Sequence, residues 1–117
     1  MRMMRWAVAF AFTQVVEVPV YLAAMRRQRF DERRAVRFCA AFGASALTHP
    51  IVWFIFPRLL SRQGYWTLFA AAEAFAVVAE GCYLGLFGLR RALRWALCAN
   101  ALSVGLGLTL RSCVGWP

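Results

Sequence analysis

The chain has 117 residues, of which 62% are hydrophobic, and its fourteen arginines against five acidic residues give a formal net charge of +9. This apolar share exceeds the roughly 45–50% of a typical soluble domain, and its concentration in four blocks excludes a single soluble domain. The arginines lie at or beyond the ends of the blocks and form no basic face with interleaved aromatic residues, so nucleic acid is not an expected partner.

The first block predicts a transmembrane helix over about residues 6–25. Thr13, Glu17 and Tyr21 follow one another at four-residue spacing, which places them on one stripe of this helix. The segment begins like a signal peptide. It ends in arginines after Met25, however, and not in a small-residue cleavage site, so we expect a retained helix.

The second block predicts a helix over about residues 35–56, again long enough to cross a bilayer. Ser45, His49 and Trp53 form its polar stripe, with Thr48 alongside. Pro50 directly follows His49, as Pro19 follows Glu17 by two residues. Because a proline inside a helix frees the carbonyl four residues before it, both helices are expected to kink beside their ionisable groups.

The third and fourth blocks predict helices over about residues 65–88 and 94–110. Glu73 and Glu80 are seven residues apart, on one face of the third helix and ~10 Å apart along its axis. The fourth helix carries Asn100 and Ser103 on one side. The third also has a GxxxG pair beginning at Gly81, which favours close packing within the bundle over a dimer contact, although a homo-oligomer stays open.

The ends of the helices carry local signals. Asp31 is expected to cap the second helix, Pro57 to close it, Gly64 to mark the next turn and Gly88 to end the third helix. Because the connections are short, consecutive helices should pack antiparallel. The sequence therefore predicts one integral membrane domain over residues 1–117, an all-α, up-down-up-down, four-helix transmembrane bundle.

Orientation follows from the distribution of arginine. The two predicted connections on one side hold nine arginines, and the opposite side, with both termini, holds five. The positive-inside rule then places both termini outside the cytoplasm. The expected location is a bacterial inner membrane, with the lipid bilayer as the main partner.

The ionisable residues at bilayer depth define the candidate site. A charge there costs about 2.5–3.5 kcal/mol on insertion scales, so such residues are expected to face one another. We expect Glu17, His49 and Asn100 to meet one glutamate of the third helix in a shared polar core, while the other glutamate lies a turn or more away, toward a vestibule. The candidate site is thus Glu17, His49, Glu73, Glu80 and Asn100, supported by Thr13, Tyr21, Thr48, Trp53 and Ser103.

In length, helix number and the position of Glu17 in its first helix, the chain resembles the small multidrug-resistance transporters. That resemblance implies exchange of a proton for a cationic ligand at Glu17. The local sequence Val-Val-Glu-Val-Pro-Val-Tyr replaces the family's Ala-Glu-x-x-Gly, so the likeness is one of architecture. The order Thr-x3-Glu-x-Pro-x-Tyr, Thr-His-Pro-x2-Trp, Glu-x6-Glu and Asn-x2-Ser also resembles small four-helix bacterial membrane proteins with no assigned activity.

Three functions fit this pattern. The first is binding or transport of a cation or proton through the polar core. The second is a metal-dependent or lipid-modifying enzyme, with Glu17, His49 and Glu73 as candidate ligands of a divalent metal. No HExxH or ExxH spacing supports a metal motif. Glu80 or Tyr83 could act as a general base, but nothing in the sequence singles out either of them, so catalysis is not favoured. No other cofactor is expected. The third is a scaffold in which protonated glutamates only hold helices together.

Overall fold

A computed structural model describes residues 1–28 and 33–115. Within them the chain is helical and contains no strand, which confirms the predicted all-α fold. The helices are α1 (Arg2–Arg27), α2 (Arg34–Pro50), the π-helix η1 (Ile51–Ile55), α3 (Phe56–Leu59), α4 (Tyr65–Leu86) and α5 (Ala92–Val114). The Asp31 cap predicted for the second helix lies outside the described residues.

Four helical segments of this part of the chain are long and apolar enough to cross a membrane: Arg2–Arg27, Arg34–Leu59, Tyr65–Leu86 and Ala92–Val114. Large apolar side chains point outward from all of them, as a lipid environment requires, including Val15, Leu47, Val78, Leu97 and Leu102. The molecule is therefore a four-helix transmembrane bundle, as predicted. The segments extend a few residues beyond their predicted bounds, except that α4 ends at Leu86 instead of Gly88.

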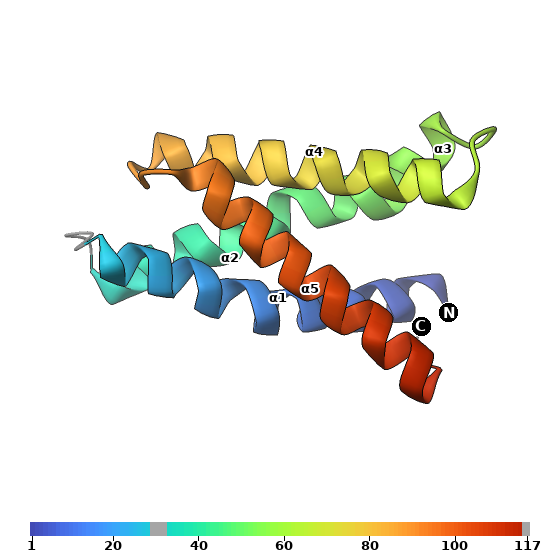
Figure 1. Cartoon of the computed structure of the whole chain (residues 1–117), viewed down its shortest axis with the longest axis horizontal. Helices are drawn as coiled ribbons and strands as arrows, with labels where there is room; N and C mark the ends of the chain where they lie inside the picture. Colours follow the sequence, from blue (N-terminus) through green and yellow to red (C-terminus); the bar gives the residue numbers. More distant parts are fainter. Residues whose placement is uncertain (29–32, 116–117) are drawn as a thin grey trace.

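The helices run up and down in alternation, and each packs against two neighbours (Figure 1). The segment α1 contacts α2 and α5, and α4 contacts the same two helices from the other side. Both chain termini and α3 lie at one end of the bundle, which we call the termini end. Arg26, Arg27, Arg90 and Arg91 lie at the opposite, arginine-rich end.

The two halves of the bundle are packed differently. Toward the arginine-rich end the helices meet through small buried side chains, with a few larger ones between them: Ala24, Ala40, Ala41, Ala44, Ala96, Ala99, Met25 and Leu84. We call this region the alanine-packed half. Toward the termini end the buried hydrophobic side chains of the described residues are sparse, and the interior there contains a cavity.

The prolines act differently from one another. The segment α1 stays a continuous α-helix through Pro19, whereas Pro50 is followed at once by the π-helix Ile51–Ile55. A wider π turn is one way in which a helix accommodates a proline, which has no N–H to donate to the carbonyl four residues before it. The prediction that Pro57 closes the second helix is wrong, because Pro57 lies in the first turn of α3, where no intrahelical bond needs its N–H, and the helix ends at Leu59.

Glycines set the junction between α4 and α5. Gly88 has φ of 96°, and the N–H of Leu89 donates to the carbonyl of Leu84 while that of Gly88 donates to Gly85, which is a Schellman motif. Just before this turn, Gly81 lies directly against Leu93. The absence of a side chain at Gly81 therefore lets α5 approach α4 closely.

Candidate functional site

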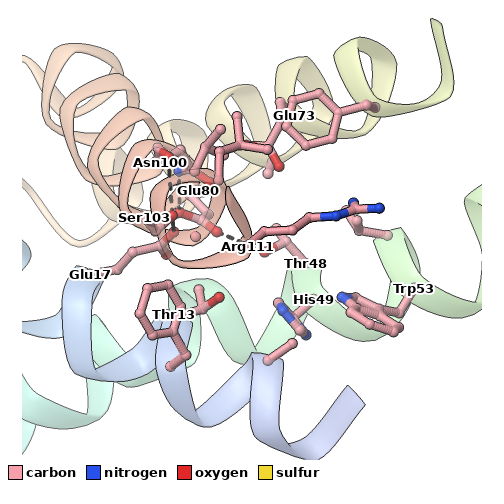
Figure 2. A pocket seen from close by; sticks show the side chains of 18 of the residues that line it. Thr13, Glu17, Thr48, His49, Trp53, Glu73, Glu80, Asn100, Ser103 and Arg111 are labelled. Carbon is pink, nitrogen blue, oxygen red and sulfur yellow. Dashed lines mark hydrogen bonds between the residues drawn. The ribbon is translucent and has the colours of Figure 1, made fainter. Parts of the chain in front are cut away.

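Two glutamates occupy the centre of the bundle, and each is only 1% exposed. Glu17 of α1 accepts hydrogen bonds from the hydroxyl of Ser45 of α2 and, at 2.8 Å, from that of Ser103 of α5. Figure 2 shows Glu17 and Ser103 pointing toward each other and toward Glu80. The carboxyl of α1 is thus held by two other helices.

Glu80 of α4 accepts three hydrogen bonds. The Tyr21 hydroxyl of α1 donates one, the Thr48 hydroxyl of α2 donates one at 2.7 Å, and Asn100 Nδ2 of α5 donates one at 2.9 Å. The second Nδ2 proton of Asn100 goes to the carbonyl of Ala96 at 2.9 Å, which fixes the amide. Both glutamates and their five donors form what we call the carboxyl cluster.

Helical periodicity explains why the cluster forms. Side chains three or four residues apart share a helix face, and three helices each supply such a pair to the interior: Glu17 with Tyr21, Ser45 with Thr48, and Asn100 with Ser103. The remaining member, Glu80, comes from α4. Because every helix contributes, none can rotate about its axis without breaking bonds to a buried carboxyl.

A cavity of about 230 Å³, the central cavity, extends from the carboxyl cluster toward the termini end. Glu17 and Glu80 line its inner part, whereas Tyr65 at the start of α4 and Arg111 near the end of α5 line its outer part. Arg111 Nη1 donates to the Tyr65 hydroxyl at 3.2 Å, and its guanidinium lies 5.9 Å from the centre of that ring. Thr13 also lines the cavity.

Glu73 lies in the outer part of the same cavity, ~10 Å along α4 from Glu80. It is half-buried, and in residues 1–28 and 33–115 no side chain donates a hydrogen bond to it. Figure 2 shows it apart from the group formed by Glu17, Glu80, Asn100 and Ser103. Glu80 is therefore the α4 glutamate that joins the cluster, and Glu73 is the one toward the vestibule.

His49 lines the cavity but bonds to neither carboxyl. Its ring lies among aromatic rings, with centroid distances of 5.3 Å to Phe10, 5.9 Å to Trp53 and 6.3 Å to Trp6. Its Nδ1 is buried without a hydrogen-bond partner among the described residues. The neighbouring Thr48 points to Glu80 instead, because consecutive residues of a helix point about 100° apart.

Ser45 is the residue of the cluster that the sequence analysis placed on a stripe without giving it a role at a carboxyl. It is 1% exposed and donates to Glu17. The sequence did hold a signal for this role, because Ser45 lies three residues before Thr48, on the same helix face, and at a similar bilayer depth to Glu17. Trp53, expected to support the site, lines the cavity and stacks on His49.

Among residues 1–28 and 33–115, the hydrogen bonds to the two buried carboxyls come from hydroxyls and one amide, and none comes from a basic side chain. Within the described ranges no arginine pairs with Glu17 or Glu80, and no group of three His, Cys, Asp or Glu side chains could hold a metal ion. Glu17, His49 and Glu73 line the same cavity without forming such a group among these residues, so a metal bound by them stays a prediction. Comparison with known protein families, curated proteins and solved structures finds no match. The resemblance to the small multidrug-resistance transporters stays a prediction.

Proposed function

We propose that this protein binds a cation at the carboxyl cluster in exchange for protons. The observation that carries the proposal is the pair of buried carboxyls, Glu17 and Glu80, in one hydrogen-bonded cluster at the inner end of a cavity. Two ionised carboxylates in a low-dielectric interior repel each other. Their charge must therefore be balanced by protons or by a bound cation.

The donors around the carboxyls can form hydrogen bonds with both the ionised and the protonated form of a carboxyl. Four of the five are hydroxyls, of Tyr21, Ser45, Thr48 and Ser103, and a hydroxyl can donate or accept. When a carboxyl is ionised, a hydroxyl donates to it; when the carboxyl is protonated, the same hydroxyl can turn and accept. A purely structural contact between helices would be built more cheaply from apolar side chains.

The position of the central cavity indicates from which side of the membrane a cation would reach the carboxyl cluster. The central cavity approaches it from the termini end, while the alanine-packed half separates it from the arginine-rich end. We place the arginine-rich end in the cytoplasm of a bacterial cell, because that side carries nine of the fourteen arginines. The cation then enters from outside, and transport requires the helices of the alanine-packed half to separate.

Proton release tests the exchange directly. The purified protein is placed in weakly buffered detergent solution with a pH indicator, and sodium, magnesium or tetraethylammonium is added separately. We expect at least one cation to release protons from the wild type and not from the Glu17→Gln, Glu80→Gln double variant. If no cation releases protons, or if the double variant releases as many, the exchange is refuted and a scaffold role is favoured.

Two further measurements complete the test. Glu73→Gln is the matched control, because it removes a carboxyl outside the cluster and should leave proton release in place. Fusion of alkaline phosphatase or a green fluorescent protein to the C-terminus tests orientation. Because the C-terminus is placed outside the cytoplasm, the phosphatase fusion should be active. A fluorescent second fusion would instead place the C-terminus in the cytoplasm and reverse the assigned orientation.

A further inference from the structure

A second cavity of about 270 Å³, the side cavity, lies beside the outer part of the central cavity. It is bounded by η1 and α3 on one side and by α4 on the other, through Val52, Pro57, Leu68 and Ala72. Trp53, Tyr65, Phe69 and Glu73 line both cavities. No residue of η1 is buried, and Val52 and Trp53 of this helix line both cavities.

Two side chains of opposite charge, Glu73 and Arg111, line the outer part of the central cavity. Arg111 bonds to Tyr65, and no ion pair joins it to Glu73 in the part of the chain that the structure describes. Figure 2 shows the Arg111 side chain extended across the cavity, with Glu73 on one side of it and His49 and Trp53 on the other. The carboxyl and the guanidinium are thus held apart, facing one space.

A ligand with both charges would satisfy both groups. A guanidinium recognises a phosphate through charge-assisted hydrogen bonds, and a carboxylate recognises an ammonium in the same way. The rings of Trp53 and Phe69 line the space beside Glu73, where an aromatic face also attracts a cation. The side cavity adjoins this space, and its lining of mainly apolar side chains suits hydrocarbon chains.

We propose that a zwitterionic phospholipid binds here from the side, with its ammonium at Glu73, its phosphate at Arg111 and its acyl chains leaving through the side cavity. Phosphatidylethanolamine has this chemistry. The site uses residues outside the carboxyl cluster, so it stands or falls separately from cation–proton exchange.

Native mass spectrometry of the protein in non-ionic detergent micelles measures the binding. Phosphatidylethanolamine is compared with phosphatidic acid, which lacks the ammonium, and with a long-chain alkylamine, which lacks the phosphate. Loss of one charge-assisted contact should weaken binding about tenfold or more. Equal binding of all three lipids would overturn the proposal. Soluble phosphoethanolamine competing as strongly as the lipid would overturn the lateral route.

Two variants test the ammonium contact and the phosphate contact of the headgroup independently. Glu73→Gln should lose the preference for phosphatidylethanolamine over phosphatidic acid while still binding phosphatidic acid, and Arg111→Gln should lose the preference over the alkylamine while still binding the amine. Retained binding of the single-charge lipid shows that the variant is folded. Arg58→Gln, an exposed arginine outside both cavities, is the matched control and should change nothing. If both cavity variants keep the wild-type preferences, the proposal fails.

Discussion

Replacing Gly81 by alanine tests the close approach of α4 and α5 beside the carboxyl cluster. A Cβ at this position would lie 2.6 Å from Leu93 Cδ2 and 3.0 Å from Leu93 Cα. The leucine side chain can rotate away, but Cα belongs to the backbone of α5, so the two helices must separate by a few tenths of an ångström. Because Glu80 precedes Gly81 in α4, this shift also strains the 2.9 Å hydrogen bond from Asn100.

The neighbouring Gly85 supplies the reference for the size of the effect. A Cβ at Gly85 would meet only Ala92 Cβ at 3.8 Å, an ordinary contact. Both variants replace a helical glycine of α4 by alanine, which favours the helix by up to about 1 kcal/mol, so most of the difference between them reports the clash. Overpacking typically costs about 1–3 kcal/mol. We therefore expect Gly81→Ala to be less stable than Gly85→Ala by about that amount.

Unfolding of both variants in detergent micelles, followed by circular dichroism against increasing denaturant, gives the comparison. Cation-induced proton release should weaken in Gly81→Ala and persist in Gly85→Ala, because only the first moves Asn100 relative to Glu80. Equal free energies of unfolding for the two variants would refute the close approach of the helices.

Three other predictions use the same preparations. Tyr21→Phe removes one of three donors to Glu80 and should lower the free energy of unfolding by about 0.6–1.5 kcal/mol; wild-type stability would show that the hydroxyl contributes nothing. Gly88→Ala should destabilise by at least about 1 kcal/mol, because alanine is strained at φ of 96°, whereas Gly105→Ala, in open space, should not. Cation affinity measured by calorimetry should fall as the pH is lowered, since protons compete for the carboxyls, and an affinity independent of pH would contradict exchange.

The membrane bundle and the inward polar stripes could be predicted from the sequence because both depend on spacing along single helices. Four apolar blocks of bilayer length predict the four spans. The four-residue spacing of Glu17 and Tyr21, and the three-residue spacing of Asn100 and Ser103, place each pair on one face. Of the group expected in the shared core, Glu17, Asn100 and one glutamate of the third helix lie in one hydrogen-bonded cluster, whereas His49, expected with them, bonds to neither carboxyl.

The choice between Glu73 and Glu80 lay beyond the sequence. The two residues share a face, so periodicity treats them alike. Which of them reaches Glu17's cluster depends on how far α4 is shifted along α1 and α5. That shift is fixed by packing between helices, including the contact of Gly81 with Leu93.

The rotation of α2 about its axis was equally open. Thr48 and His49 are adjacent, and either could face the carboxyls. Burial of Ala40, Ala41 and Ala44 against the other helices turns Thr48 and Ser45 inward and leaves His49 among aromatic rings. Pro50 predicted a local disturbance of the helix. Its missing N–H can lead either to a π turn or to a sharp kink, and the sequence alone does not choose between them.

The distribution of donors among the helices has a consequence for biosynthesis. Asn100 and Ser103 both belong to α5, so until this helix enters the membrane, Glu80 lacks its amide partner and Glu17 lacks one of its two hydroxyls. A nascent chain holding only α1, α2 and α4 in the bilayer thus exposes incompletely bonded acids to lipid. Insertion of α5 supplies both donors and so completes the hydrogen bonds of the two buried carboxyls.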